Sequence, residues 1–244
     1  MADTARLAWF HCYSGIAGDM ALGALIDAGA DVDEVRAILR RLPLDGWALE
    51  VEPVLRGGIA GTKVHVHATD STVVRTAAHI QGLVAEARLP ERVQQRAAAV
   101  FDALARAEGR LHGRPPDQVH FHEVGGIDAI VDIVGTCAAL EVLEVDTVTC
   151  SPIAVGLGMV RAAHGIIPNP APAVVELLTG IPTKGVDLAV ALEAATRVPA
   201  DLVHRPDLGR LEAGACADLV WFDDDLRVQR TWVDGRVVAE LGRA

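Results

Sequence analysis

The densest group of potential metal-binding side chains lies between residues 120 and 132. His120 and His122 are two residues apart, and Glu123 follows directly. On an extended segment, residues i and i+2 project to the same side, so both imidazoles could reach one ion. Imidazole together with carboxylate suits nickel, zinc, cobalt or iron, and these residue types do not choose among those metals. The segment therefore predicts a divalent-metal site of unspecified identity.

Two aspartates follow these histidines at a spacing of four. On a helix, this spacing places Asp128 and Asp132 on the same face. Asp132 interrupts the apolar run 130–134, so we expect it to be buried, and a buried carboxylate needs a partner or a metal. The alternative is that the aspartates are solvated charges at a helix N-terminus and that the two histidines cap or pack. The expected burial of Asp132 favours the functional interpretation.

A glycine-containing turn, Ser14-Gly15-Ile16-Ala17-Gly18-Asp19, follows a predicted strand and opens a predicted helix. Free backbone N–H groups at such a place favour an anion such as a substrate phosphate, with Ser14, Gly15 and Gly18 around it. The turn matches neither a Walker motif nor a dinucleotide fingerprint. The alternatives are a tight turn in which Asp19 caps the helix, or an Asp19 that binds metal.

Arg161 and His164 lie in a glycine- and proline-rich stretch, residues 156–172, which we expect to be an irregular loop. An arginine and a histidine on a rigid loop suit substrate binding, and a surface histidine is the alternative.

Two other pairs have structural interpretations. His65 and His67 alternate with valines on a predicted strand, so the polar face of a sheet explains them. His11 and Cys12, on the first predicted strand, are interpreted as core residues.

These candidates depend on elements that the sequence pattern predicts. We expect strands at 7–13, 47–53, 63–68 and 146–153, and helices at 20–28, 32–41, 73–86, 91–111, 127–143 and 173–178. The character changes near residue 187, where a helix at 189–203 precedes strands at 217–222 and 228–233 and an Asp-Gly turn at 234–235. The predicted fold class is α/β (α+β): a mixed sheet covered by helices in residues 1–187, then a helix and a β-hairpin in residues 188–244.

Composition restricts the class of protein. The chain has 244 residues, a net charge of −11 and 51% hydrophobic residues, so it can bury a core but has no basic excess for nucleic acid. We find no signal peptide and no apolar run long enough to span a membrane. The four cysteines are far apart, which favours reduced thiols in the cytoplasm.

Three segments together resemble the nickel-insertion proteins that mature the nickel-pincer nucleotide cofactor of lactate racemase. They are the turn 14–20 with Leu22-Gly23-Ala24-Leu25, the segment 120–132, and the stretch from Ser151-Pro152 through Ala162-Ala163-His164-Gly165 to Pro170-Ala171-Pro172-Ala173 and Glu176-Leu177-Leu178. The resemblance covers residues 6–187, in order and at family-like spacing.

The resemblance implies a lyase-type nickel chelatase. It would insert nickel into pyridinium-3,5-bisthiocarboxylic acid mononucleotide, forming one Ni–C and two Ni–S bonds while CTP is hydrolysed with Mg or Mn. Combined with the residue types, it assigns metal binding to His120, His122 and Glu123, and ligand or base roles to Asp19, Asp128 and Asp132. Substrate binding falls to Ser14, Gly15, Gly18, Arg161 and His164.

The end of the chain departs from that family. Residues 192–238 resemble the end of an amidohydrolase of the N-acetylglucosamine-6-phosphate deacetylase type, and the family's CTP-binding domain is not recognised. Three hypotheses follow: a nickel-insertion enzyme incomplete without that domain, a non-catalytic nickel-binding module acting with a separate CTP-binding chain, and a deacetylase fragment. A nickel-pincer enzyme as partner and a homo-oligomer stay open.

Overall fold

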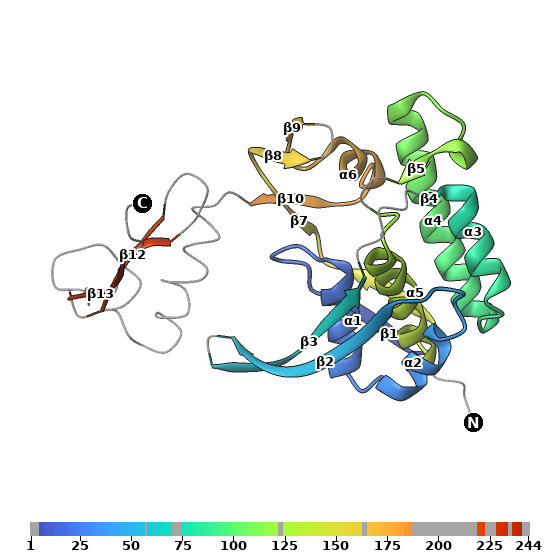
Figure 1. Cartoon of the computed structure of the whole chain (residues 1–244), viewed down its shortest axis with the longest axis horizontal. Helices are drawn as coiled ribbons and strands as arrows, with labels where there is room; N and C mark the ends of the chain where they lie inside the picture. Colours follow the sequence, from blue (N-terminus) through green and yellow to red (C-terminus); the bar gives the residue numbers. More distant parts are fainter. Residues whose placement is uncertain are drawn as a thin grey trace. The chain divides into compact units, whose positions relative to one another are not determined.

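The computed structural model describes residues 5–56, 58–69, 75–121, 124–162, 165–186, 219–222, 228–233 and 236–240 (Figure 1). The chain divides between Gly185 and Val186 into two compact units. The strands up to residue 186 are β1 (Leu7–Phe10), β2 (Trp47–Arg56), β3 (Ile59–Ala68), β4 (Arg75–Thr76), β5 (His120–Phe121), β6 (Thr147–Cys150), β7 (Ile153–Gly156), β8 (Met159–Ala162), β9 (Gly165–Pro168) and β10 (Thr183–Val186). The helices are α1 (Gly18–Asp27), α2 (Val32–Leu39), α3 (Ala77–Glu86), α4 (Glu91–His112), α5 (Ile127–Val142) and α6 (Pro172–Leu177), with the short 3-10 helix η1 (Pro116–Gln118).

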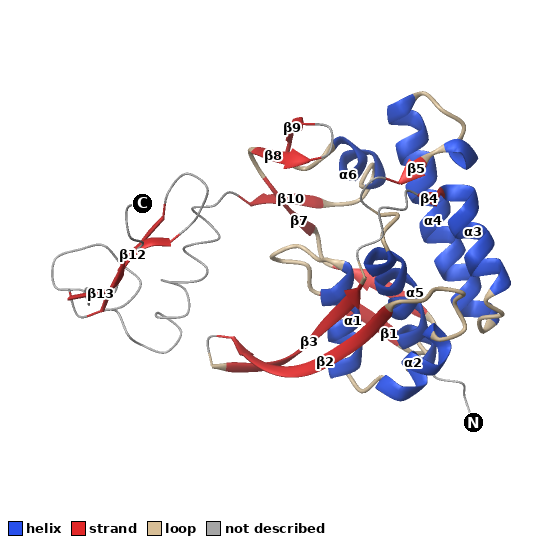
Figure 2. Cartoon of the chain, viewed as in Figure 1, coloured by secondary structure: helices blue, strands red, loops and turns tan. Residues whose placement is uncertain are grey.

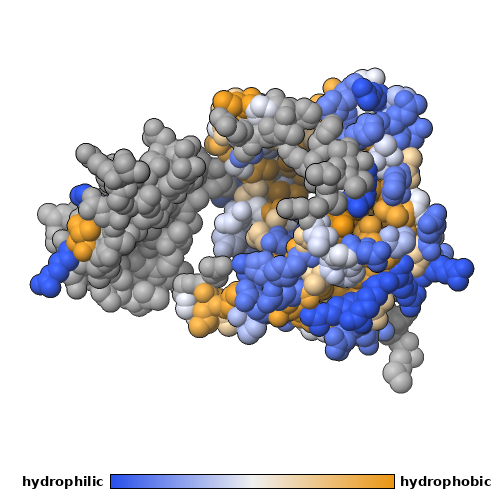
Figure 3. Space-filling model, viewed as in Figure 1, coloured by the Kyte–Doolittle hydropathy of each residue, from blue (hydrophilic) through white to orange (hydrophobic). Residues whose placement is uncertain are grey.

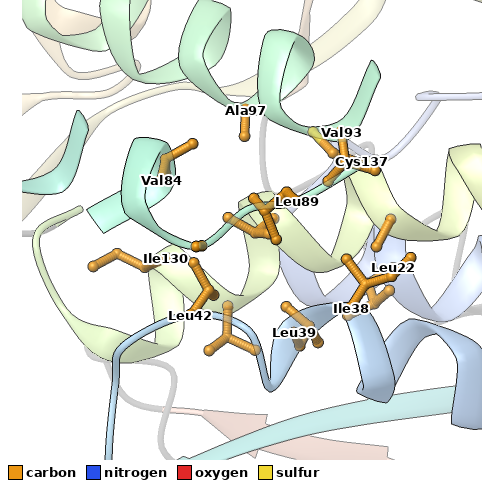
Figure 4. Packing of buried hydrophobic residues seen from close by; sticks show 14 of the residues in the cluster. Leu22, Ile38, Leu39, Leu42, Val84, Leu89, Val93, Ala97, Ile130 and Cys137 are labelled. Carbon is orange, nitrogen blue, oxygen red and sulfur yellow. The ribbon is translucent and has the colours of Figure 1, made fainter. Parts of the chain in front are cut away.

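Helix α5 forms the centre of the first unit. Nine of its 16 residues are buried, because its sequence is apolar on almost every side. Helices α1, α2 and α4 all pack against it. Gly135 permits the close approach of α1, since a Cβ at this position would lie 2.9 Å from a methyl carbon of Leu22. Figure 4 shows part of the resulting aliphatic core, with Ile130 and Cys137 of α5 among its labelled side chains.

The long antiparallel hairpin β2–β3 covers α1. Its register runs from Trp47 opposite Ala68 to Arg56 opposite Ile59, and α1 lies against β3. The alternation predicted for β3 is confirmed: Val64 is buried, and His65 and His67 pair with carboxylates of β2 on the other face. Figure 3 shows hydrophobic residues at the far end of this hairpin.

Helices α3 and α4 form an antiparallel pair beside α5. The α4 prediction is confirmed, and this helix ends at Gly113, whose φ of 61° is left-handed. Helix α3 begins at Ala77, later than predicted, because the side chain of Thr76 caps it by accepting from the backbone N–H of His79.

Strand β1 pairs in parallel with β6, Leu7 lying opposite Thr147 and Phe10 opposite Cys150. The prediction of one buried strand over 146–153 is wrong. Strand β6 is exposed and ends at Cys150, and Pro152 lies before β7, a position at which a missing N–H interrupts a ladder. Strand β7 pairs instead with β10.

The prediction of an irregular loop over residues 156–172 is also wrong. Residues 159–168 form the antiparallel hairpin β8–β9, with Met159 opposite Pro168. Pro168 stands at the end of its strand, where its missing N–H does not interrupt the ladder. The prolines that suggested a loop therefore delimit a hairpin.

The described part of the second unit is the antiparallel sheet β11 (Leu219–Phe222), β12 (Val228–Val233) and β13 (Arg236–Glu240), in that order. The predicted hairpin around residues 234–235 is confirmed, since Val233 lies opposite Arg236. The predicted helix 189–203 lies outside the described residues.

The α/β class is confirmed, although the described strands form several small sheets rather than one mixed sheet (Figure 2). Helix α1 lies between the hairpin β2–β3 and helix α5, which cover its apolar residues on both sides. Within the described residues, no helix is long and apolar enough to cross a membrane.

Candidate functional site

Asp19, Asp128 and Asp132 form a carboxylate cluster between the N-terminal ends of α1 and α5. Burial, and after it the negative charges of Asp19 and Asp128, raise the pKa of the Asp132 carboxyl to about 6. A hydrogen bond from the Asp19 backbone opposes the shift. The structure therefore brings together the three residues that the sequence analysis proposed as bases or ligands.

Asp132 is the most unusual member of this carboxylate cluster. Its Oδ1 is fully buried and has no hydrogen-bond partner among the described residues. A buried carboxylate oxygen without a donor is costly unless it holds a proton or faces a cation. The arrangement is suited to receive a positive charge.

The turn that precedes α1 closes over Asp132. A Cβ at Gly18 would lie 2.7 Å from the Cβ of Asp132 and 2.9 Å from its Oδ2, so only glycine fits there. Gly15 has a φ of 91°, in the left-handed region, and its N–H donates to the carbonyl oxygen of Cys12. These two glycines allow the turn to reach the carboxylate cluster, while Ser14 stays exposed.

The prediction that Asp19 caps α1 is wrong. The N-cap is Ala17, which offers no side-chain hydrogen bond, and Asp19 lies within the first turn. Its carboxylate accepts from the backbone N–H of Met20 at 2.8 Å. Helix α1 begins at Gly18, two residues earlier than a capping Asp19 requires, and Gly18 lies against Asp132. Asp19 thus contributes its charge to the carboxylate cluster.

The predicted metal-binding residues are only partly described. His120 is exposed on the short strand β5, opposite Thr76 of β4, whereas His122 and Glu123 lie outside the described residues. Within the described ranges, no three His, Cys, Asp or Glu side chains are placed to hold one ion. The assignment of His120, His122 and Glu123 to metal stays a prediction.

The substrate-binding assignment of Arg161 and His164 also stays a prediction. Arg161 lies on β8 with Ile166 opposite, so the backbone of this position is in a hairpin, while His164 lies outside the described residues.

Comparison with known proteins decides the family. Residues 8–205 match the sequence model of the nickel insertion protein family. The chain belongs to the nickel insertion protein family. Its match extends 18 residues beyond residue 187, where the sequence pattern changes character.

Several curated nickel insertion proteins are similar in sequence to this chain over most of its length. A putative nickel insertion protein of Roseiflexus castenholzii is 48% identical over 176 residues, which are 72% of this chain and 45% of that protein. The pyridinium-3,5-bisthiocarboxylic acid mononucleotide nickel insertion protein of Desulfitobacterium hafniense is 45% identical over 191 residues, 78% of this chain and 48% of that one. A protein of the same name in Staphylococcus saprophyticus is 42% identical over 188 residues, with shares of 77% and 48%.

The chain spans about half the length of the curated nickel insertion proteins that it matches. No solved structure matches it.

One residue that positions the segment before α5 could not be identified from the sequence. Arg75 of β4 is only 8% exposed, and its guanidinium donates to the carbonyl oxygen of Gly125 at 3.0 Å. Gly125 packs tightly on Phe121, since an added Cβ would lie 2.5 Å from that residue's carbonyl oxygen. Arg75 thereby holds the turn at Gly125, directly before α5. No pattern in the sequence singles it out, because its partner is a backbone atom 50 residues away.

Replacing Arg75 with methionine is expected to lower the free energy of unfolding by about 1.5 kcal/mol, since it removes a charged donor from a buried carbonyl. Methionine keeps most of the apolar contact of the arginine stem. Urea denaturation measures the loss, and Arg114→Met, at an exposed arginine, is the control. Equal stability of both variants would show that Arg75 does not hold the turn.

His11 was expected in the core together with Cys12, and this is wrong for the histidine. Cys12 is buried, and burial raises the pKa of its thiol, but His11 is exposed on the opposite side of the chain. The alternation of an extended segment separates the two side chains.

Proposed function

We propose that this chain takes part in inserting nickel into pyridinium-3,5-bisthiocarboxylic acid mononucleotide, yielding the nickel-pincer nucleotide cofactor of lactate racemase. This substrate stands in the names of the relatives from Desulfitobacterium hafniense and Staphylococcus saprophyticus. The observation that carries the proposal is the buried, unpartnered oxygen of Asp132 within the carboxylate cluster.

The chemistry requires a proton acceptor. Forming a Ni–C bond on the pyridinium ring breaks a C–H bond, and the electron pair of that bond goes to Ni²⁺ without a change of oxidation state. The proton must go to a base. A carboxyl group with a pKa of about 6 is well matched to this task near neutral pH, and Asp132 is such a group. In this proposal Asp19, Asp128 and Asp132 together stabilise the positive charge of the incoming metal, and Asp132 accepts the proton.

The other predicted residues complete the proposed site. His120, His122 and Glu123 would deliver nickel, as imidazole and carboxylate ligands do. The backbone N–H groups of the Gly15–Gly18 turn, with Arg161 and His164, would hold the phosphate and thiocarboxylate groups.

CTP hydrolysis with Mg or Mn is proposed to depend on a further domain or a separate chain. The observation that favours this is the length of the relatives, of which the chain matches less than half. The chain would then be a chelatase that is incomplete alone, or a non-catalytic nickel-binding module.

The test supplies the chain with Ni²⁺, the bisthiocarboxylate substrate, CTP and Mg²⁺, and follows the absorbance of the nickel-pincer product. Product from the chain alone supports an enzyme, and product only after adding the C-terminal half of a relative supports a module. Absence of product in both reactions, while a full-length relative forms it, would contradict the proposal. Asp132→Asn, which removes the proposed base, is expected to form no product, and Asp117→Asn, at an exposed aspartate, is its charge-matched control.

We also propose that the segment after residue 187 derives from a deacetylase-type amidohydrolase end and that the protein is cytoplasmic. The antiparallel sheet β11–β12–β13 supports the first point, because a small β-domain is what that resemblance implies. A deacetylase assay on N-acetylglucosamine-6-phosphate tests whether any activity accompanies it, and none is expected because the resemblance includes no catalytic residue.

A further inference from the structure

Three aromatic side chains stand in a row along β1 and the residues after it. The ring centroids of Trp9 and His11 are 5.1 Å apart with planes 19° from parallel. Those of His11 and Tyr13 are 5.0 Å apart and tilted by 48°. Residues two apart on an extended segment project to the same side, so the three rings form one continuous ladder.

The ladder is exposed rather than packed. Trp9 is 59% and Tyr13 63% exposed, although large aromatic side chains usually gain most of their stabilising energy from burial. Exposed aromatic rings held in a fixed row are suited to stack on another planar ring.

A second ladder in the same protein shows the contrast. His65 and His67 on β3 have ring centroids 5.9 Å apart, but each ring faces a carboxylate, Glu52 at 3.4 Å and Glu50 at 2.6 Å. Cross-strand ion pairs account for that ladder. Within the described residues, no carboxylate pairs with His11 in this way, and the ladder of Trp9, His11 and Tyr13 is left without a structural explanation.

A cavity of about 690 Å³ adjoins the ladder, between β1 and α1. This volume is in the usual range for a small-molecule site. Trp9 and His11 line it together with Ile16 and Met20. Arg6 also lines the cavity, and its guanidinium pairs with the carboxylate of Glu144 at 3.0 Å and donates to the carbonyl oxygen of Leu143 at 2.9 Å. The walls are therefore mostly apolar, as is usual for a site that binds a small molecule.

We propose that the ladder of Trp9, His11 and Tyr13 is the platform on which the pyridinium ring of the substrate stacks, an inference that rests on the proposed function. A cationic, planar ring gains both stacking and cation–π energy on an indole face. Tyr13 is followed in the chain by the turn whose Gly18 lies against Asp132.

The test uses a probe that cannot take up nickel as the substrate does: pyridinium-3,5-dicarboxylic acid mononucleotide, titrated without metal. Calorimetry is expected to show affinity at least tenfold weaker for Trp9→Ala than for the unaltered chain. Trp9→Phe, which keeps a ring, is expected to retain most of the affinity while losing the fluorescence quenching that the probe causes. The double variant His65→Ala/His67→Ala is the matched control and should bind as the unaltered chain does.

Each outcome decides the matter. Unchanged affinity in Trp9→Ala, with unchanged quenching in Trp9→Phe, would overturn the platform even if the unaltered chain inserts nickel. A lower mass of Trp9→Ala in sedimentation, with unchanged probe affinity, would also overturn it and assign the face to a contact between copies. If the unaltered chain binds the probe but no preparation inserts nickel, the platform stands and the proposed function fails. Thermal unfolding of each variant verifies that the fold is intact.

Discussion

Replacing Asp132 with asparagine is expected to weaken nickel binding at pH 7.5 by roughly 100-fold. Asparagine has nearly the same shape as aspartate, so the contact with Gly18 is kept while the negative charge is lost. The buried Oδ1 that has no donor in the structure would then no longer carry charge toward the metal. Calorimetric titration with Ni²⁺ measures the change, and Asp117→Asn should bind as the unaltered chain does.

The same substitution has an opposite effect on the stability of the fold. Because the pKa of Asp132 rises from 3.8 to about 6 on folding, its favourable contribution is fully present below pH 3.8 and is lost as the pH rises through 6. Above pH 6 the ionised side chain destabilises the fold by about 1–3 kcal/mol. Asp132→Asn is therefore expected to be more stable than the unaltered chain at pH 7.5, by this amount, with a smaller difference at pH 5.

Urea denaturation of both proteins between pH 5 and 8, without metal, checks this dependence. Nickel should reverse it, since binding a cation releases the Asp132 proton. Below pH 6, the nickel affinity of the unaltered chain should therefore fall more steeply than that of Asp132→Asn. The additional fall is about tenfold per pH unit. The comparison of the two proteins isolates the contribution of Asp132 from those of all other titratable groups. Identical pH profiles would refute a role for Asp132 in metal binding.

Replacing Gly18 with alanine is expected to lower the free energy of unfolding by about 2–3 kcal/mol and to weaken nickel binding together with it. The added Cβ would meet the Cβ of Asp132 at 2.7 Å, so either the turn or α5 must shift. A shift of the turn moves Asp19 away from Asp132 and opens the carboxylate cluster. Urea denaturation and nickel titration of the same preparation measure both effects.

Gly82→Ala supplies the matched control. Gly82 lies inside α3, and nothing lies within 4 Å of an added Cβ, so alanine there should stabilise the protein by about 0.5–1 kcal/mol without changing nickel affinity. If Gly18→Ala behaved like Gly82→Ala, the tight contact between the turn and Asp132 would not exist in solution.

The local elements of this protein were largely predictable from its sequence. The apolar residues of α5 and the alternation of Val64 with His65 are signals carried by neighbouring residues. The spacing of Asp128 and Asp132 on one helix face is likewise a local property, since it follows from 3.6 residues per turn. The candidate aspartates could therefore be named from the sequence by itself.

The tertiary structure alone decided how these residues meet. Asp19 and Asp132 are far apart in the sequence, and the absent side chain of Gly18 is what allows the turn to approach α5. Arg75 acts on a backbone carbonyl, which leaves no trace in residue type. The exposure of Trp9 depends on which strands flank β1. The sequence pattern of β1 predicts only which residues project to the same side of the strand as Trp9. Helical and strand periodicity arise from the local backbone, whereas the pKa of Asp132 and the open face of β1 arise from packing between distant segments, and only the folded chain brings those segments together.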